Sequence, residues 1–259
     1  MRRKIVFIVN HAAFFCSHRL NLAIEIIKRG WDFHLIIGQP ASIEMEKHAI
    51  KILNKNKIYY TRTSFQSNFT LNLFKEIYGM YEIKKKLKKI NPDLVHLVSP
   101  KAILFGGIVS RLVGVKNIVI AISGLGSLVT FNRSFKSSIL KKIYFIFLKY
   151  ISLNNHNKII VQNTSDKRII MNKLNKLKPK DFVLIPGSGV DPKKFKYVDY
   201  KKSKNIVLMS SRILIDKGVI EYLKASEILK KEFPNFKFLI TGSLDYKSSA
   251  VVNSATFKN

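Results

Sequence analysis

Short apolar runs recur along the chain, and segments with a helical pattern separate them. In a helical segment, apolar residues recur three and four positions apart, as in Leu20, Ala23, Ile24 and Ile27. Continuous apolar runs are typical of parallel strands that are covered on both faces. The alternation therefore predicts an α/β fold with a doubly wound parallel sheet. Seven runs predict strands in the first three quarters of the chain: 5–9, 33–37, 58–61, 94–98, 118–121, 159–161 and 183–185.

The predicted helices follow these strands in turn. Residues 10–16 are predicted to be the loop after the first strand, with Ser17 as the N-cap of a helix and Gly30 just past its end. The remaining helices are predicted over residues 42–54, 71–90, 101–112, 137–153 and 164–175.

A second strand–helix–strand unit begins late in the chain, with strands over 206–209 and 236–240 and a helix over 218–233. The stretch before it is rich in lysine and has no periodicity, which is typical of a linker. We therefore predict one domain over residues 1–190, a linker over 191–204, and the beginning of a second domain over 205–259. One such unit cannot bury both faces of its strands, so the second domain is expected to be incomplete.

The charge balance is strongly basic, with 46 Lys and Arg against 16 Asp and Glu and a net charge of +30. Nucleic-acid binding, docking on an anionic membrane, or a plain compositional bias could each explain it. Aromatic residues do not alternate with the lysines as they do on a base-stacking surface, so we expect no nucleic-acid partner. The basic run 84–89 and the aromatic and basic segment 137–153 favour docking on an anionic membrane.

Compartment and metal chemistry follow from what the sequence contains. The single Cys16 excludes an intramolecular disulfide and fits a reducing cytoplasm. No stretch reaches the length of a membrane span, and no cleavage site follows the first apolar run. We therefore expect a cytoplasmic protein that lies peripherally on the inner face of the cell membrane. No Asp-x-Asp pair follows a strand, so neither a metal nor a cofactor is expected.

Two cations, Arg212 and Lys217, lie in the turn between strand 206–209 and the helix that follows it. In a parallel sheet this turn opens onto the ligand crevice. The helix behind it presents free N–H groups and the positive end of its dipole. A guanidinium and an ammonium in this place suit a diphosphate. Solvated loop cations are an equally good interpretation of the spacing alone.

Six segments together resemble one family, the family-4 retaining glycosyltransferases. These proteins have two Rossmann-like domains that face each other across a cleft, the GT-B fold. The two segments at 185–191 and 211–222, taken in tandem, are the most specific. The segments are Phe15-Cys-Ser-His-Arg-Leu-Asn-Leu-Ala, Pro92-Asp-Leu-Val-His-Leu-Val-Ser-Pro-Lys-Ala, Ser123-Gly-Leu-Gly-Ser, Val161-Gln-Asn-Thr-Ser-Asp, Ile185-Pro-Gly-Ser-Gly-Val-Asp and Ser211-Arg-Ile-Leu-Ile-Asp-Lys-Gly-Val-Ile-Glu-Tyr.

The resemblance implies roles in the second domain and at the domain crossing. Arg212 and Lys217 match the pair that holds the pyrophosphate of the sugar donor. Gly187, Ser188 and Gly189 match the turn beside the domain crossing, although a plain strand-to-linker turn is equally consistent. Gly242 matches a turn near the nucleobase, for which an ordinary turn glycine is the stronger interpretation.

On the acceptor side, the resemblance places His18 where an imidazole could bind a hydroxyl or a phosphate, and Arg19 where it could bind a lipid phosphate. The glycine loop with Gly124 and Gly126 could offer backbone N–H groups to a substrate. Many family members have a histidine in that loop. This chain has none there, so no catalytic side chain is assigned. His96 lies inside an apolar strand and is predicted to be buried with its hydrogen bonds satisfied.

The resulting hypothesis is a transferase that moves a hexose or N-acetylhexosamine from a nucleotide sugar, UDP-linked by preference, to a lipid-linked or saccharide acceptor in surface polysaccharide synthesis. The alternative is a truncated, non-catalytic remnant that binds a membrane or a partner. A dinucleotide-dependent oxidoreductase ranks last, because no Gly-x-Gly-x-x-Gly follows the first strand.

Overall fold

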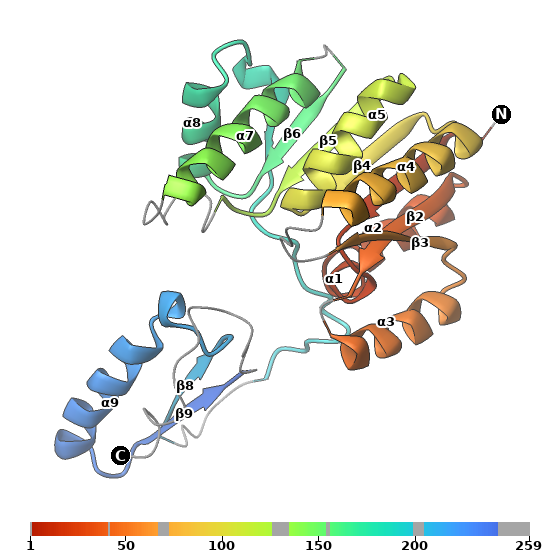
Figure 1. The fold of residues 1–259 in the computed structure, drawn as a ribbon. Coiled ribbons are helices and arrows are strands. Elements are labelled where there is room, and N and C mark those ends of the chain that lie inside the picture. The colour runs from red at the N-terminus through yellow and green to blue at the C-terminus, as the bar shows by residue number, and fades with distance from the viewer. Residues whose placement is uncertain are drawn as a thin grey trace. The chain divides into compact units, whose positions relative to one another are not determined.

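A computed structural model of the chain describes residues 2–40, 42–66, 73–125, 135–153, 156–198 and 205–242. The chain divides into two units, Met1–Val190 and Asp191–Asn259 (Figure 1).

The larger unit is built on a seven-stranded parallel sheet with the order β3-β2-β1-β4-β5-β6-β7. The α/β fold class and the parallel sheet predicted from the apolar runs are therefore confirmed. The strands are β1 (Lys4–Val9), β2 (Asp32–Gln39), β3 (Tyr60–Gln66), β4 (Leu94–Val98), β5 (Asn117–Ile122), β6 (Lys158–Val161) and β7 (Phe182–Leu184).

Helices cover both faces of this sheet (Figure 1). Buried residues of α1 (Ala12–His18), α2 (Leu20–Lys28) and α3 (Ile43–Lys55) belong to one core cluster. The second cluster takes its buried residues from the opposite face. The helices of that cluster are α4 (Leu73–Ile90), the π-helix η1 (Ala102–Gly106), α5 (Gly107–Val113), α7 (Phe135–Ser152) and α8 (Thr164–Lys173).

The alternation of side chains along β1 places Phe7 in one cluster and Val6 and Ile8 in the other, so this central strand contributes to both cores. The connections of β1 and β4 leave toward opposite faces of the sheet. The carboxyl ends of these neighbouring strands are therefore the topological switch point, where open α/β sheets bind their ligands.

The prediction of a loop over residues 10–16 was wrong, since Ala12 to His18 form α1. Ser17 is not an N-cap but lies inside this helix, and a second helix begins at Leu20. The cause is a long-range contact. The buried carboxylate of Glu46, on α3, accepts the N–H groups of Ala12 and Ala13 at 3.1 Å each. Gly30 does lie just past the end of α2, with a φ of 79°.

The third strand is longer than the apolar run 58–61 predicted, because polar residues find partners in the sheet. The hydroxyl of Thr63 donates to the carbonyl of Ile37 at 3.0 Å, and the N–H of Ser64 donates to the carboxylate of Glu82 at 2.6 Å. These bonds satisfy polar groups that the apolar pattern alone does not place in a strand.

The smaller unit contains two parallel strands, β8 (Ile206–Ser210) and β9 (Lys237–Thr241), and the helix α9 (Val219–Glu232). The hydroxyl of Tyr222, on α9, lies 2.9 Å from the carbonyl oxygen of Val207 and 3.0 Å from that of Leu239. This one side chain ties the helix to both strands. Every residue of β8 except Met209 is exposed.

Candidate functional site

After the carboxyl end of β1, the first N–H groups of α1 are bonded to side chains of the protein itself. His11 caps α1 by accepting the N–H of Phe14 at its Nδ1 atom, at 3.2 Å. Glu46 accepts the N–H groups of Ala12 and Ala13, the first two residues of the helix, and forms an ion pair with Arg62 at 2.9 Å. The start of α1, where a Rossmann dinucleotide site would hold a phosphate, is thus occupied by the protein's own anion.

The environment of Cys16, on α1, disfavours its thiolate form. Burial raises the pKa of its thiol to about 11, and the negative charge of Glu46 adds to the effect. Its Sγ atom lies 3.5 Å from the carbonyl oxygen of Ala49. Because the thiolate is the nucleophilic form, a role for Cys16 in catalysis does not fit this environment.

His18 is the last residue of α1 and is exposed. Its ring stacks on Phe14 at a centroid distance of 4.6 Å, and its Nδ1 atom lies 2.6 Å from the hydroxyl oxygen of Ser17. The next residue, Arg19, joins α1 to α2. One guanidinium nitrogen donates to the carbonyl of His18 at 2.9 Å and to the hydroxyl of Ser188 at 2.8 Å. Two candidate residues that are far apart in sequence, His18 and Ser188, are therefore linked through Arg19.

The turn after β7 places Ser188 between Gly187 and Gly189, which have φ values of 77° and 70°. An ideal Cβ atom at either glycine would meet no heavy atom within 4 Å, so the turn borders open space. Glycine is needed here for its backbone conformation rather than for close packing.

Gly124 follows β5 and has a φ of 145°, and Leu125 after it is buried. The N–H of Leu125 donates to the carboxylate of Asp166 at 3.2 Å. The carboxylate of an α8 residue therefore orients this part of the glycine loop. The other glycine predicted for the acceptor side, Gly126, lies outside the described residues.

His96, on β4, is buried as predicted, but its hydrogen bonds are not all satisfied. Its ring stacks on Phe7 at a centroid distance of 4.4 Å, and within the described chain its Nε2 atom has no hydrogen-bond partner. Burial, with a smaller contribution from the positive charge of Arg19, lowers the pKa of His96 to about 3. The neutral imidazole is therefore part of the core at neutral pH.

In the smaller unit, Arg212 and Lys217 lie in the segment between β8 and α9, and both are exposed. Leu214 is buried between them, and the short 3-10 helix η3 (Ile215–Lys217) leads to Gly218, which begins α9 with a φ of 79°. The buried leucine anchors the segment, while the two cations on either side of it face solvent.

Gly242 stands directly after β9 and lies against this segment. An ideal Cβ atom at Gly242 would overlap the carbonyl oxygen of Ser211, which is backbone and cannot rotate away. The N–H of Ser211 also donates to the carbonyl of Thr241 at 3.0 Å. Gly242 therefore permits the close approach that holds the backbone next to Arg212.

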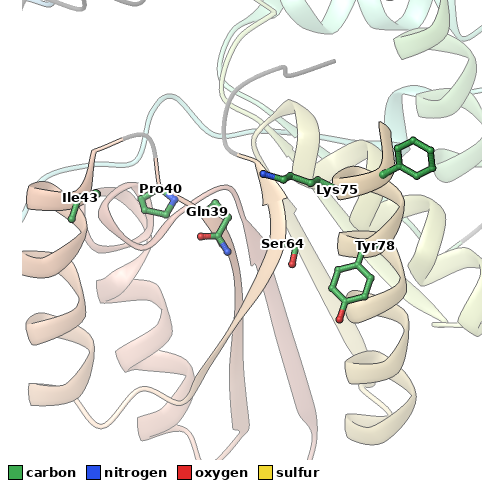
Figure 2. Close-up of a pocket in the computed structure, with 7 residues that line it drawn as sticks. Gln39, Pro40, Ile43, Ser64, Lys75 and Tyr78 are labelled. Carbon is green, nitrogen blue, oxygen red and sulfur yellow. The ribbon is translucent and has the colours of Figure 1, made fainter. Parts of the chain in front are cut away.

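A pocket at the carboxyl ends of β2 and β3 was not predicted from the sequence. Figure 2 shows Ile43 of α3 on one side of these strands and Lys75 and Tyr78 of α4 on the other. The pocket is open to solvent, has a volume of about 690 Å³, and is lined by Gln39, Pro40, Ile43, Ser64, Phe74, Lys75 and Tyr78. Its signal in the sequence is the pair Phe74 and Tyr78, which lie one helical turn apart. The sequence pattern of this region predicted only a helix.

The candidate residues thus fall into two groups. His18, Gly124 and the Gly187–Gly189 turn belong to the larger unit, whereas Arg212, Lys217 and Gly242 belong to the smaller one. In the described ranges, no three His, Cys, Asp or Glu side chains gather as metal ligands would. None of the helices in those ranges is both long enough and apolar enough to cross a bilayer.

The parallel sheet in each unit is consistent with a GT-B-like α/β protein. The chain belongs to the glycosyl transferase 4-like family, whose model matches residues 4–163. The resemblance noted from the sequence motifs is therefore confirmed.

Two curated relatives share sequence with most of this chain. An *Escherichia coli* UDP-Gal:alpha-D-GlcNAc-diphosphoundecaprenol alpha-1,3-galactosyltransferase is 24% identical over 202 residues, which cover 73% of this chain and 50% of the relative. A *Campylobacter jejuni* N,N'-diacetylbacillosaminyl-diphospho-undecaprenol alpha-1,3-N-acetylgalactosaminyltransferase is 26% identical over 196 residues, covering 71% and 50%. The chain therefore spans about half the length of these relatives.

Solved structures agree on the fold. A glycosyltransferase from *Rickettsia africae* aligns with a TM-score of 0.61 and 19% identity, over 95% of this chain and 62% of that one. A UDP-N-acetylglucosamine 2-epimerase from *Neisseria meningitidis*, solved with UDP-GlcNAc bound, aligns with a TM-score of 0.58 and 13% identity, over 95% and 66%. Since enzymes of different reaction types share the architecture, these likenesses describe fold and not chemistry.

Proposed function

We propose that this protein is a glycosyltransferase that moves a hexose or N-acetylhexosamine from a UDP-sugar to a sugar carried on a polyprenyl diphosphate. The observation that carries the proposal is the family match over residues 4–163. Both curated relatives are named for transfer to diphosphoundecaprenol-linked acceptors, which supports a lipid-linked acceptor in surface glycan synthesis. No observation in the described residues favours the alternative of a non-catalytic remnant.

The chemistry expected of Arg212 and Lys217 follows from their charge. When the glycosidic bond to the donor breaks, negative charge develops on the departing nucleoside diphosphate. Fixed cations beside that diphosphate bind the transition state more tightly than the ground state, so they accelerate the reaction as well as holding the donor. Retention of configuration is what the family resemblance implies. Neither a metal nor a cofactor enters this scheme.

The proposal is tested by a transfer assay with the 259-residue chain. The protein is incubated with UDP-hexoses or UDP-N-acetylhexosamines and a polyprenyl-diphosphate-linked N-acetylhexosamine, and the lipid product is analysed by mass spectrometry. We expect a product heavier by one sugar residue with one of the donors. Absence of any product, together with absence of UDP binding in calorimetry, would refute the proposal.

We further propose that the protein works peripherally on the cytoplasmic, anionic surface of the cell membrane. On α4, the exposed residues Phe74, Ile77, Tyr78 and Tyr81 follow the spacing of a single helix face. Phe74 is 87% exposed. An apolar stripe of this kind on the outside of a basic helix is typical of a surface that enters the lipid headgroup region.

The charges around this stripe are almost all positive. Lys84, Lys85 and Lys88 are exposed on the second half of α4. The two acidic residues of α4 are bonded to groups outside the helix. Glu76 is buried and pairs with Lys101 at 2.5 Å, and Glu82 accepts the N–H of Ser64. The cations would therefore meet anionic headgroups without competition from a neighbouring carboxylate.

The large apolar and aromatic residues of α7, the second docking segment that the sequence suggested, differ in their burial. Tyr144 and Phe145 are buried in the core, whereas Ile143, Ile146 and Phe147 are exposed. α7 covers the same face of the sheet as α4. Its exposed residues fit the proposed docking surface, while its buried ones serve the fold.

The double substitution of Phe74 and Tyr78 by Ser should weaken binding to phosphatidylglycerol-containing vesicles by at least about tenfold. Each large apolar side chain contributes about 1.5–3 kcal/mol when it leaves water, and about 1.4 kcal/mol corresponds to a factor of ten. Binding is measured by vesicle sedimentation. Ile228→Ser, an exposed apolar residue of α9, is the matched control. Equal binding of the double variant and the wild type, or tight binding of both to purely zwitterionic vesicles, would contradict the proposed surface.

A further inference from the structure

Two cations of the larger unit that leave solvent are compensated by buried carboxylates. Lys101 is buried and meets the buried carboxylate of Glu76 at 2.5 Å. Arg62 is partly buried and meets the buried carboxylate of Glu46 at 2.9 Å. A desolvated cation is costly unless an anion compensates it, so both pairs are physically reasonable.

Within the ranges that the structure describes, Arg19 has no such carboxylate partner. Its side chain is half-buried at the junction of α1 and α2, and burial lowers the pKa of its guanidinium. Among the residues described, no carboxylate forms an ion pair with it. Its partners are two neutral oxygens, the carbonyl of His18 and the hydroxyl of Ser188. The charge of Arg19 is strong enough at the buried ring of His96 to disfavour its protonation.

The surroundings of Arg19 supply further donors. The hydroxyl of Ser188 accepts from Arg19, which leaves its own proton available to donate. Within the described chain, the backbone N–H groups of Gly187, Ser188 and Gly189 are not bonded to any other group. This turn borders open space at both glycines. A guanidinium, a hydroxyl and adjacent backbone N–H groups are the donors that a tetrahedral oxyanion requires.

The place in the fold is also that of a ligand site. Arg19 follows the helix that begins after β1, and Ser188 lies in the turn that follows β7. Both segments therefore belong to the carboxyl edge of the sheet, where open α/β sheets bind their ligands. The start of α1 is already occupied by Glu46, so an external anion would be received at Arg19 rather than there.

We propose that Arg19, Ser188 and the Gly187–Gly189 turn form a binding site for a phosphate group of a diphosphate substrate. That phosphate belongs either to the polyprenyl diphosphate of the acceptor or to the nucleoside diphosphate of the donor. The inference rests on the proposed function for the identity of the substrate. The presence of an anion site rests on the geometry of the larger unit alone.

The test compares the full-length wild type with Arg19→Ala and Arg19→Lys by calorimetric titration with inorganic pyrophosphate, UDP and geranyl diphosphate. Loss of a charge-assisted contact should weaken pyrophosphate binding about ten- to a hundredfold in Arg19→Ala, and less in Arg19→Lys. Arg29→Ala is the matched control, because Arg29 stands at the other end of α2 and pairs with Glu25. We expect this control to bind like the wild type.

The three ligands distinguish the source of the phosphate. Weaker binding of geranyl diphosphate with unchanged UDP binding assigns the site to the acceptor, and the reverse assigns it to the donor. Ser188→Asp provides a second variant should Arg19→Ala not fold, because a carboxylate beside Arg19 should compete with the ligand. The inference would be overturned if a folded Arg19→Ala bound all three ligands as tightly as the wild type. If Arg19→Ala does not fold, the same result for Ser188→Asp would overturn it.

The outcomes also separate this inference from the proposed function. If Arg19→Ala keeps both anion binding and sugar transfer, the site is refuted while the transferase stands. The wild type could instead transfer no sugar and bind no UDP, yet bind pyrophosphate more tightly than Arg19→Ala does. In that case the anion site stands and the transferase is refuted.

Discussion

Substitution of both Arg212 and Lys217 by Ala should weaken UDP binding by about two to four orders of magnitude. Each cation is expected to form a charge-assisted contact with the diphosphate, worth about 1.5–3 kcal/mol, so two contacts sum to about 3–6 kcal/mol. Both side chains are exposed and lie on either side of the buried Leu214, which anchors the segment in both the wild type and the variant. Isothermal titration calorimetry of the 259-residue chain measures the change directly.

Two matched variants show whether the effect is specific. Lys230→Ala with Lys231→Ala removes the same amount of charge from the last turn of α9 and should change UDP affinity by less than about threefold. Arg212→Lys keeps the charge but loses the planar fork of donors, and should have intermediate affinity. If the Arg212 and Lys217 double variant binds UDP as the wild type does, these residues do not belong to the donor site.

The same substitutions should lower the rate of transfer beyond their effect on donor binding. The diphosphate gains negative charge as the glycosidic bond breaks, so the lost cations matter more in the transition state than in the ground state. At saturating donor, kcat of the single variants should therefore still be reduced.

The strands of the larger unit could be predicted from the sequence because their physical signal is local. A strand buried on both faces must be apolar at successive positions, and the run at residues 5–9 has this property. The parallel sheet then follows from the helices between the runs. A local pattern of this kind needs no knowledge of distant residues.

Where distant residues decide the structure, the sequence prediction failed. The helix over Ala12–His18 depends on the carboxylate of Glu46, which is more than thirty positions away in the chain. The polar end of β3 is likewise held by partners in β2 and α4. Neither contact leaves a periodic signal in its own segment.

The candidate site divides in the same way. The Arg212 and Lys217 segment could be recognised because strand, cations and helix are contiguous in sequence. The Arg19 and Ser188 contact joins residues 169 positions apart, and only the parallel sheet brings them together. The pocket between α3 and α4 is equally non-local, since its lining comes from β2, β3 and the two helices.

Acidification should destabilise the larger unit through His96. Burial and the nearby charge of Arg19 hold the pKa of His96 at about 3 in the folded state, whereas an unfolded histidine has a pKa of about 6.5. Between these values the unfolded chain binds a proton that the folded chain excludes, so stability falls as the pH falls. At about pH 4.5, this residue alone should lower the free energy of unfolding by about 2–3 kcal/mol relative to neutral pH.

Burial lowers the pKa values of His11 and His34 as well, so both should add to the loss of stability in the same direction. His96→Phe isolates the contribution of His96. The substitution removes the proton-binding group, keeps an aromatic ring against Phe7, and deletes the Nε2 atom that has no hydrogen-bond partner within the described chain. At neutral pH the variant should therefore be at least as stable as the wild type.

Urea unfolding at neutral pH and at about pH 4.5 measures the effect, and the fluorescence of Trp31, the only tryptophan of the sequence, reports on the unit that contains His96. The difference between the two pH values should be smaller in His96→Phe by about 2–3 kcal/mol. The exposed His48, replaced by Gln, is the matched control and should leave the difference unchanged. An equal difference in the wild type and His96→Phe would show that the buried imidazole does not govern acid stability. The sensitivity would then be sought at the two partly buried histidines whose pKa values burial also lowers. These are His11, in the cap of α1, and His34, in β2, whose ring lies 2.8 Å from the hydroxyl of Thr61.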